Sequence, residues 1–207
     1  KCYKFWIKNS VQKLPEKYVA VFLHYQPERT STPDANLYAC QLYTIQLISS
    51  ILRKKGLNWQ IVVREHPQQF KAKWQNRFRN LDFYRELINI DGVVLSSLDT
   101  DPFTLLDGAE AVASLNGSVL IEAGARNIPS IGFGPLSKMF DWSNYFSVNS
   151  YGDLAQSISS ISQNSYSGTT FEEYLFSHFQ NTVQLDISIN TNISLYKSML
   201  AIALTEI

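Results

Sequence analysis

A short turn in the middle of the chain combines residue types that can hold a phosphate. Asn116 and Gly117 interrupt a strand-like apolar segment, residues 111–115, and Ser118 stands where it can cap the helix expected next. Such a turn directs backbone N–H groups and the positive end of the helix toward one point, which suits an anion. Glu122 lies one helical turn after Ser118 on the same face, so it could bind a sugar hydroxyl beside that anion. The alternative is a plain strand-helix-strand unit with a serine cap and a solvated glutamate.

Polar side chains also follow the first buried strand that the sequence predicts. Residues 18–24 form a nearly continuous apolar run that ends at His24, as expected of a strand buried on both faces of a parallel sheet. Gln26 and Glu28 lie in the loop beyond it, where they could hydrogen-bond a sugar, and Glu28 could act as a general base. His24 either lines the same cleft or only ends its strand, and both interpretations stay open.

A histidine beside a proline follows the second predicted strand, residues 59–64. In open α/β sheets the ligand lies beyond the carboxyl ends of the strands, so His66 and Pro67 fall where function is expected. The alternative for His66 is an ordinary residue at the end of a strand, hydrogen-bonded to the backbone.

Strands and helices must alternate to position these residues. Apolar runs predict strands at 18–24, 59–64, 92–96, 111–115, 128–133 and 145–148. Helical periodicity predicts helices at 37–55, 81–88, from 102, from 118, 151–162, 170–179 and 192–204. This order predicts an α/β fold, a doubly wound Rossmann-like parallel sheet with helices on both faces. Residues 1–17 are interpreted as a lead-in helix or linker, and residues 18–207 as one Rossmann-like domain with C-terminal helices.

Charge is distributed unevenly along a chain whose net charge is zero. Residues 1–80 contain 14 Lys and Arg against 4 Asp and Glu, and residues 81–207 contain 4 against 14. The zero net charge argues against a broad nucleic-acid-binding surface, so no nucleic-acid partner is expected. The uneven distribution reflects either solvated faces or a basic edge that meets an anionic acceptor, a lipid headgroup or a neighbouring domain.

Several features bear on the compartment. No segment approaches the roughly 18 apolar residues of a membrane span, and the start of the chain lacks a secretory signal. Cys2 and Cys40 lack the spacing of a metal or redox motif and are expected to be free thiols in a reducing compartment. A cytoplasmic location is therefore expected, and contact with the inner face of the cell membrane is left open. The first residue is Lys1 rather than Met, which favours an excised domain or a trimmed start.

Three segments together resemble a known family. HYQPE at residues 24–28, REHP at 64–67 and NGSVLIEAGARNIP at 116–129 are similar to the capsule polysaccharide biosynthesis family, which includes Kdo transferases. More broadly, they look like the donor-binding, C-terminal half of a GT-B glycosyltransferase. The resemblance covers about residues 19–134. It implies transfer of a sugar from a nucleotide-activated donor, CMP-Kdo first and a UDP-sugar second, to a saccharide or glycolipid acceptor.

The resemblance also implies roles for individual residues. His66 would contact the nucleotide phosphate, Gly117 and Ser118 would hold the same phosphate, and Glu122 would bind the ribose. Protein dipoles would supply the charge stabilisation, so no metal or other cofactor is implied. The expected catalytic residues are His66 and Glu28. The expected donor-binding residues are Gln26, His66, Pro67, Asn116, Gly117, Ser118 and Glu122.

The sequence departs from the family pattern in two places. Arg126 stands where the family often has a small residue, and Asn127-Ile128-Pro129 replaces a common Gly-Lys-Pro. The catalytic base of GT-B enzymes usually comes from an N-terminal acceptor half, which the resemblance implies is separate or missing here.

The alternative functions are a nucleotide-sugar epimerase-like enzyme and a non-catalytic nucleotide- or partner-binding module. Asp99-Thr-Asp101 also matches the Asp-x-Asp pattern of metal-dependent transferases, although Pro102 favours a helix cap at Asp101.

Overall fold

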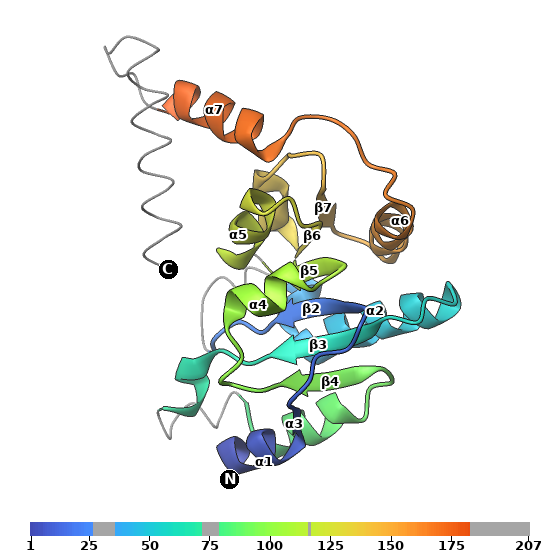
Figure 1. Ribbon diagram of the computed structural model, residues 1–207, viewed down its shortest axis with the longest axis vertical. Coiled ribbons are helices and arrows are strands. Elements are labelled where there is room, and N and C mark those ends of the chain that lie inside the picture. The colour runs from blue at the N-terminus through green and yellow to red at the C-terminus, as the bar shows by residue number, and fades with distance from the viewer. Residues whose placement is uncertain (27–35, 72–78, 116, 183–207) are drawn as a thin grey trace. The chain divides into compact units, whose positions relative to one another are not determined.

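The computed structural model describes residues 1–26, 36–71, 79–115 and 117–182 (Figure 1). The chain divides into two compact units, Lys1–Glu172 and Glu173–Ile207. The first unit contains the sheet described below. The described part of the second unit belongs to helix α7 (Phe171–Thr182), which begins at the end of the first unit. The helix predicted at 192–204 lies outside the described residues.

Seven parallel strands form one sheet, in the order β1-β4-β3-β2-β5-β6-β7. The strands are β1 (Ser10–Val11), β2 (Tyr18–Phe22), β3 (Gln60–Arg64), β4 (Val93–Ser96), β5 (Ala111–Ser114), β6 (Ser130–Phe133) and β7 (Tyr145–Val148). All six neighbouring pairs run parallel. From β2 the chain builds outward through β3 and β4, and it then returns to the other side of β2 for β5, β6 and β7. The predicted doubly wound parallel sheet is therefore confirmed.

Helices cover both faces of the sheet (Figure 1). One face carries α2 (Gln41–Lys54), α3 (Leu81–Ile88) and α6 (Tyr151–Ser162), in which α2 contacts both of the others. The opposite face carries α4 (Pro102–Asp107) and α5 (Val119–Ala125). Arg126, just after α5, joins these two helices because it pairs with Asp107 at 2.7 Å and lies over the Phe103 ring. No helix among the described residues has the length and apolar character that a membrane span requires.

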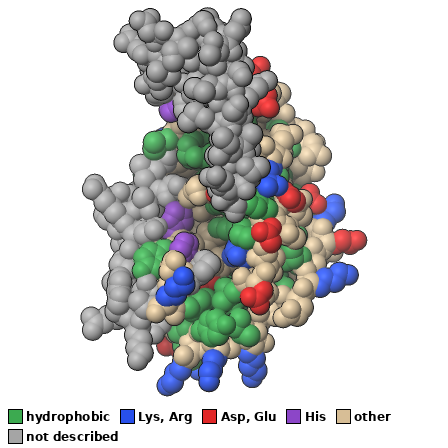
Figure 2. Space-filling model, turned by 60° about the vertical axis from the view of Figure 1, so that its left-hand side comes forward, with side chains coloured by type: hydrophobic (Ala, Val, Ile, Leu, Met, Phe, Trp, Pro, Cys, Tyr) green, Lys and Arg blue, Asp and Glu red, His purple; other side chains and the backbone are tan. Residues whose placement is uncertain are grey.

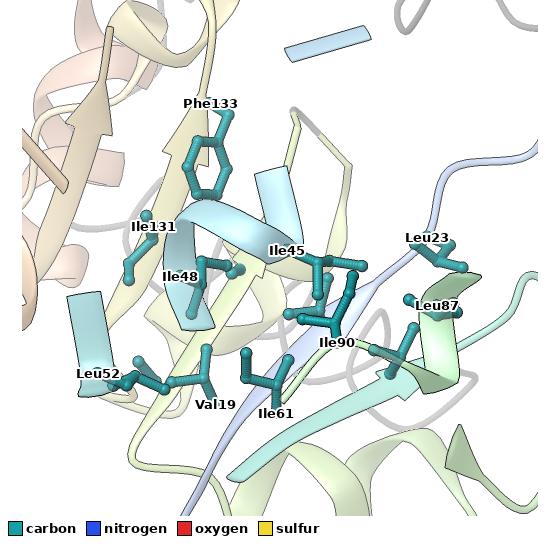
Figure 3. Close-up of a cluster of buried hydrophobic side chains, with 14 of the residues drawn as sticks. Val19, Leu23, Ile45, Ile48, Leu52, Ile61, Leu87, Ile90, Ile131 and Phe133 are labelled. Carbon is teal, nitrogen blue, oxygen red and sulfur yellow. The ribbon is translucent and has the colours of Figure 1, made fainter. Parts of the chain in front are cut away.

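Alternate residues of each strand point to opposite faces, and one face packs the main core. Val19 and Ile61 point toward α2, where they meet Ile45 and Ile48, and all four are buried (Figure 3). Tyr18, one residue earlier in β2, points the other way and donates a hydrogen bond to the Leu105 carbonyl of α4. Each fully buried aliphatic side chain contributes about 1.5–3 kcal/mol relative to exposure. The apolar strands therefore hold helices on both sides.

Helix ends match the sequence in part. Asp101 caps α4 through a 2.8 Å hydrogen bond from the Thr104 N–H, as predicted. The helix predicted from residue 37 is wrong in its start, because a 3₁₀ turn, η1 (Asn36–Ala39), precedes α2. Cys40 between them has an extended backbone, and the Gln41 side chain is drawn toward the end of β2, where its Oε1 accepts from the His24 N–H.

The N-terminal segment contributes a helix, which was one of its two interpretations, and an edge strand that was not predicted. Helix α1 (Cys2–Asn9) buries Trp6 completely, and the Trp6 indole donates a 2.9 Å hydrogen bond to the Ser96 carbonyl. The two-residue strand β1 then pairs with β4. Two residues are too short for any periodicity, so only the tertiary contact defines this strand.

Gly132 in β6 provides a test of how tightly the sheet packs. A Cβ atom there would collide with the Tyr145 hydroxyl and lie 3.0 Å from the Ser137 Cβ. We expect Gly132→Ala to lower the free energy of unfolding by about 1–3 kcal/mol, because a buried site without space must shift to accept an added methyl group. The measurement is chemical denaturation.

Gly152→Ala in α6 is the matched control. A Cβ at Gly152 would meet only the Ser150 Oγ, at an ordinary 3.6 Å. This substitution should leave stability unchanged or raise it by up to about 1 kcal/mol, because alanine favours helix. Equal effects of the two substitutions would contradict the packing described for β6.

Candidate functional site

The candidate site lies where the strand order reverses, between the carboxyl ends of β2 and β5. Ligands of open α/β sheets bind in the crevice at this switch point. The chain after β2, which carries His24, meets the turn after β5, which carries Gly117. A Cβ built on Gly117 would lie 3.4 Å from His24 Nε2 and 3.4 Å from Ser114 Oγ. The His24 ring therefore lies against the turn after β5, and Figure 2 shows histidine side chains gathered on one face of the molecule.

Two glutamine side chains hold the backbone after β2. Gln41 Oε1 accepts from the His24 N–H at 2.9 Å, and Gln69 Oε1 accepts from the Gln26 N–H at 2.8 Å. These amides replace the strand partner that the chain loses beyond Leu23, whose N–H still donates to the Arg64 carbonyl. Gln26 lies at the predicted edge of the sheet, but its side chain is only 8% exposed. Glu28, the predicted general base, lies outside the described residues.

His66 lies at the carboxyl end of β3, the neighbour of β2 in the sheet. Its side chain is exposed, and its ring centroid lies 5.6 Å from that of Tyr25. Nδ1 accepts a 3.2 Å hydrogen bond from the Gln68 N–H, so the neutral ring carries its proton on Nε2. Pro67 begins the 3₁₀ helix η2 (Pro67–Phe70), which presents that N–H. The structure thus leaves an N–H donor at the outer end of the His66 ring.

A buried ion pair fixes the backbone beneath His66. Glu65 is fully buried, and both of its carboxylate oxygens accept from Arg79 Nη1, at 2.7 and 2.9 Å. Tyr84 donates a third hydrogen bond at 2.7 Å. Arg79 Nη2 also donates to the His24 carbonyl at 3.1 Å, so a single guanidinium joins the ends of β2 and β3. Burial, and then the Glu65 charge, raise the pKa of Tyr84 far above its usual value, which keeps this phenol a donor.

The turn after β5 differs from the prediction in one respect. Ser118 occupies the N-cap position of α5, but its hydroxyl makes no cap hydrogen bond. It donates instead to Glu122 Oε1 at 2.9 Å, so the predicted serine cap is wrong. Ser118 has a helical rather than an extended backbone (φ −53°, ψ −27°), so its Oγ is not placed to accept from an N–H of the first turn. Glu122 accepts from the hydroxyl because the two side chains lie one turn apart on the same face. That shared face was predicted and is confirmed. Asn116 lies outside the described residues.

The Asp-x-Asp pattern has a structural explanation. The Asp101 carboxylate accepts from the Thr104 N–H at 2.8 Å and from the Thr104 hydroxyl at 3.2 Å, as a helix cap does. Within the part of the chain that the structure describes, no three His, Cys, Asp or Glu residues are grouped as a metal site.

Two arginines of the site region were missed in the sequence. Arg79 belongs to a basic segment without periodicity, and nothing in that segment indicates a partner 14 residues away. Arg64 is the last residue of β3 and the one charged residue in an apolar strand, which is a signal that could have been noticed. Both side chains are almost completely buried.

The comparisons with solved structures concern the fold. The chain has a Rossmann-like α/β fold, and its solved neighbours are GT-B enzymes. No family model and no curated protein matches the sequence.

Three structural neighbours have a similar fold. The alpha,alpha-trehalose-phosphate synthase (UDP-forming) of Burkholderia vietnamiensis is 12% identical with a TM-score of 0.52, and the match covers 97% of this chain and 46% of that one. The UDP-GlcNAc 2-epimerase of Methanocaldococcus jannaschii is 13% identical with a TM-score of 0.48 and coverages of 87% and 48%. KpsC of Thermosulfurimonas dismutans, a beta Kdo 2,7 transferase, is 14% identical with a TM-score of 0.44 and coverages of 70% and 45%.

These comparisons establish the fold and nothing finer. Identities this low say nothing about the substrate, and the two lower TM-scores are too weak to support an inference. The chain spans about half the length of each of the three proteins. The activity of a whole enzyme therefore does not follow from these similarities.

The buried ion pair yields a stability prediction. Arg79→Met should lower the free energy of unfolding by about 3–5 kcal/mol, because it leaves the Glu65 charge buried without its partner. Chemical denaturation at neutral pH measures the change.

Arg85→Met provides the matched control, since Arg85 forms an exposed 2.9 Å pair with Asp82. Its loss should cost less than about 1 kcal/mol. A loss at Arg79 as small as that at Arg85 would show that the Glu65 network does not hold the ends of β2 and β3.

Proposed function

We propose that this chain is the donor-binding part of a glycosyltransferase that uses a nucleotide-activated sugar. The first candidate for the donor is a CMP-activated acid sugar such as CMP-Kdo, and the second is a UDP-sugar. The process would be capsule or surface polysaccharide biosynthesis. The observation that carries the proposal is the meeting of His24 with the Gly117 turn at the switch point, with His66 on the next strand. Adjacent strands lie about 4.8 Å apart, so a single nucleotide can reach all three strand ends.

The geometry supports a role for His66 at the phosphate. Its Nε2–H is directed away from η2, because Nδ1 is engaged by Gln68. A donor in this position offsets the negative charge that develops on the phosphate as the glycosidic bond breaks. Backbone N–H groups of Gly117 and Ser118 would bind the same phosphate from the β5 side.

Glu122 would bind a ribose hydroxyl. In the structure its carboxylate accepts from the Ser118 hydroxyl. On donor binding, we expect the Ser118 proton to turn to the phosphate while Glu122 accepts a hydrogen bond from the ribose. This exchange keeps every polar group paired, which avoids the cost of an unsatisfied buried donor or acceptor.

The remaining donor-site and catalytic assignments are part of the same proposal. Gln26, Pro67 and Asn116 would border the donor, and Glu28 would be a candidate general base. No metal would be required, since protein dipoles and His66 act on the phosphate. A saccharide or glycolipid acceptor would bind an N-terminal acceptor domain. The basic residues of the first half would face that domain or the anionic inner face of the cell membrane.

Calorimetric titration tests this proposal. CMP, CDP, UDP and GDP are titrated into the purified chain, into His66→Ala and into Glu122→Ala. We expect selective binding of CMP, weakened about tenfold to a hundredfold by each substitution, because each removes a hydrogen bond to the nucleotide. Selective UDP binding would instead indicate the second class of donor.

Glu86→Ala is the matched control for Glu122→Ala, because Glu86 is an exposed glutamate on α3, which packs on the other face of the sheet. It should leave the affinity unchanged. If no nucleotide binds the folded wild type, the donor-site proposal fails, and a partner-binding module becomes the leading function.

A further inference from the structure

Arg64 is a buried arginine without an ion pair. It ends β3, its side chain is 7% exposed, and Nη1 donates a 2.6 Å hydrogen bond to the Thr100 carbonyl. None of the ion pairs among the described residues includes it. A guanidinium carries five N–H donors, and a carbonyl oxygen does not neutralise its charge. Most of the hydrogen-bonding capacity of Arg64 is therefore unused by the protein groups described.

Asp101 is the acidic group whose charge acts on Arg64, and it compensates the charge of Arg64 only in part. Burial lowers the pKa of Arg64, and the Asp101 charge counteracts that shift. However, the Asp101 carboxylate is already the cap of α4, with two hydrogen bonds from Thr104. Arginine stays charged at neutral pH in proteins, so the cost of burying this charge remains. An anion beside the guanidinium would offset that cost.

The register of the sheet places Arg64 under the proposed donor site. Arg64 pairs with Phe22 of β2, and Ser114 on the next strand donates to the Phe22 carbonyl. Glu65, the next residue, points to the opposite side, where it meets Arg79. Arg64 therefore lies on the side of the sheet that carries α4 and α5, as its bond to the Thr100 carbonyl just before α4 requires. His66 follows two residues after Arg64, at the start of η2 beyond the same strand end.

A second buried polar group lies beside Arg64. In the register that pairs Val63 with Leu95, Ser96 follows directly next to Arg64 on the adjacent strand. The Ser96 hydroxyl is fully buried and has no hydrogen-bond partner in the structure. Buried hydroxyl groups are almost always hydrogen-bonded, so this one marks a place for an acceptor.

We propose that Arg64 is a second anion-binding residue of this site, whose guanidinium binds an oxyanion of the donor beneath His66. This inference rests on the proposed function. Arginine suits the task because its planar fork binds phosphate or carboxylate through two parallel hydrogen bonds. The oxyanion is either the nucleotide phosphate or the carboxylate of an acid sugar. Arg64 would supply a permanent charge that holds the donor, while His66 would supply the hydrogen bond to the leaving group.

Nitrogen-15 NMR of the arginine side chains tests the inference on the intact wild-type chain. The Nε–H signal of Arg64 is assigned by its loss in Arg64→Lys. Inorganic phosphate, CMP and free Kdo are then titrated separately, with sodium chloride as the ionic-strength control. We expect a saturable shift of the Arg64 signal with phosphate and CMP if the phosphate is the bound group, or with free Kdo if the carboxylate is.

Affinity measurements on variants give a second readout. Arg64→Gln should weaken CMP binding about tenfold to a hundredfold, because a hydrogen-bonded charge contact is lost, and should leave the weak binding of cytidine unchanged. If Arg64 binds the carboxylate of the acid sugar rather than the phosphate, Arg64→Gln would weaken binding of free Kdo instead. Arg53→Gln, which removes the same charge from an exposed arginine on α2, should have no effect. Melting temperatures of all variants separate loss of binding from loss of fold.

The possible outcomes separate the two proposals. A phosphate-induced shift without nucleotide binding would leave Arg64 as an anion-binding residue and reject the proposed function. Equal affinities of wild type and Arg64→Gln for CMP and for free Kdo would reject the role of Arg64 and keep the donor site. An Arg64 signal that none of the three probes moves would also reject the role of Arg64, making it a structural partner of Thr100.

Discussion

The buried ion pair between Glu65 and Arg79 is the constraint on which the candidate site depends. The Leu23 N–H still donates to the Arg64 carbonyl, and beyond this bond both segments leave the sheet. Arg79 bridges this point because it binds the Glu65 carboxylate and the His24 carbonyl at once. Both residues are buried, so the pair operates away from water, where losing one partner is costly. The orientation of His24 and of the neighbouring His66 follows from it.

The sheet separates structure from chemistry by the alternation of its side chains. Residues that point toward α2 and α3 are aliphatic and form the main core, and Glu65 ends that series with its own buried partners. Residues that point toward α4 and α5 become polar at the carboxyl ends, in Arg64 and Ser114. The same short strand therefore contributes to the stability of one face and to the proposed donor site on the other.

Local signals predicted the architecture well, and contacts distant in sequence were not predictable. The strand at 145–148, the helix at 81–88 and the cap at Asp101 match because each depends on residues within one turn of the chain. The Ser118 cap was wrong because Ser118 has a helical backbone, which does not place its Oγ to accept from the first turn of α5. The bond from Arg79 to Glu65 and the approach of His24 to Gly117 depend on strand order, which local periodicity does not encode.

The proposed donor site requires that a nucleotide bind at the carboxyl ends of β2, β3 and β5. A crystal structure of the chain with CMP would show this binding. We expect the phosphate at the turn of Gly117 and Ser118, within hydrogen-bonding distance of His66 Nε2, and the ribose beside Glu122. A nucleotide bound at any other place on the chain, with this edge of the sheet empty, would contradict the proposed site.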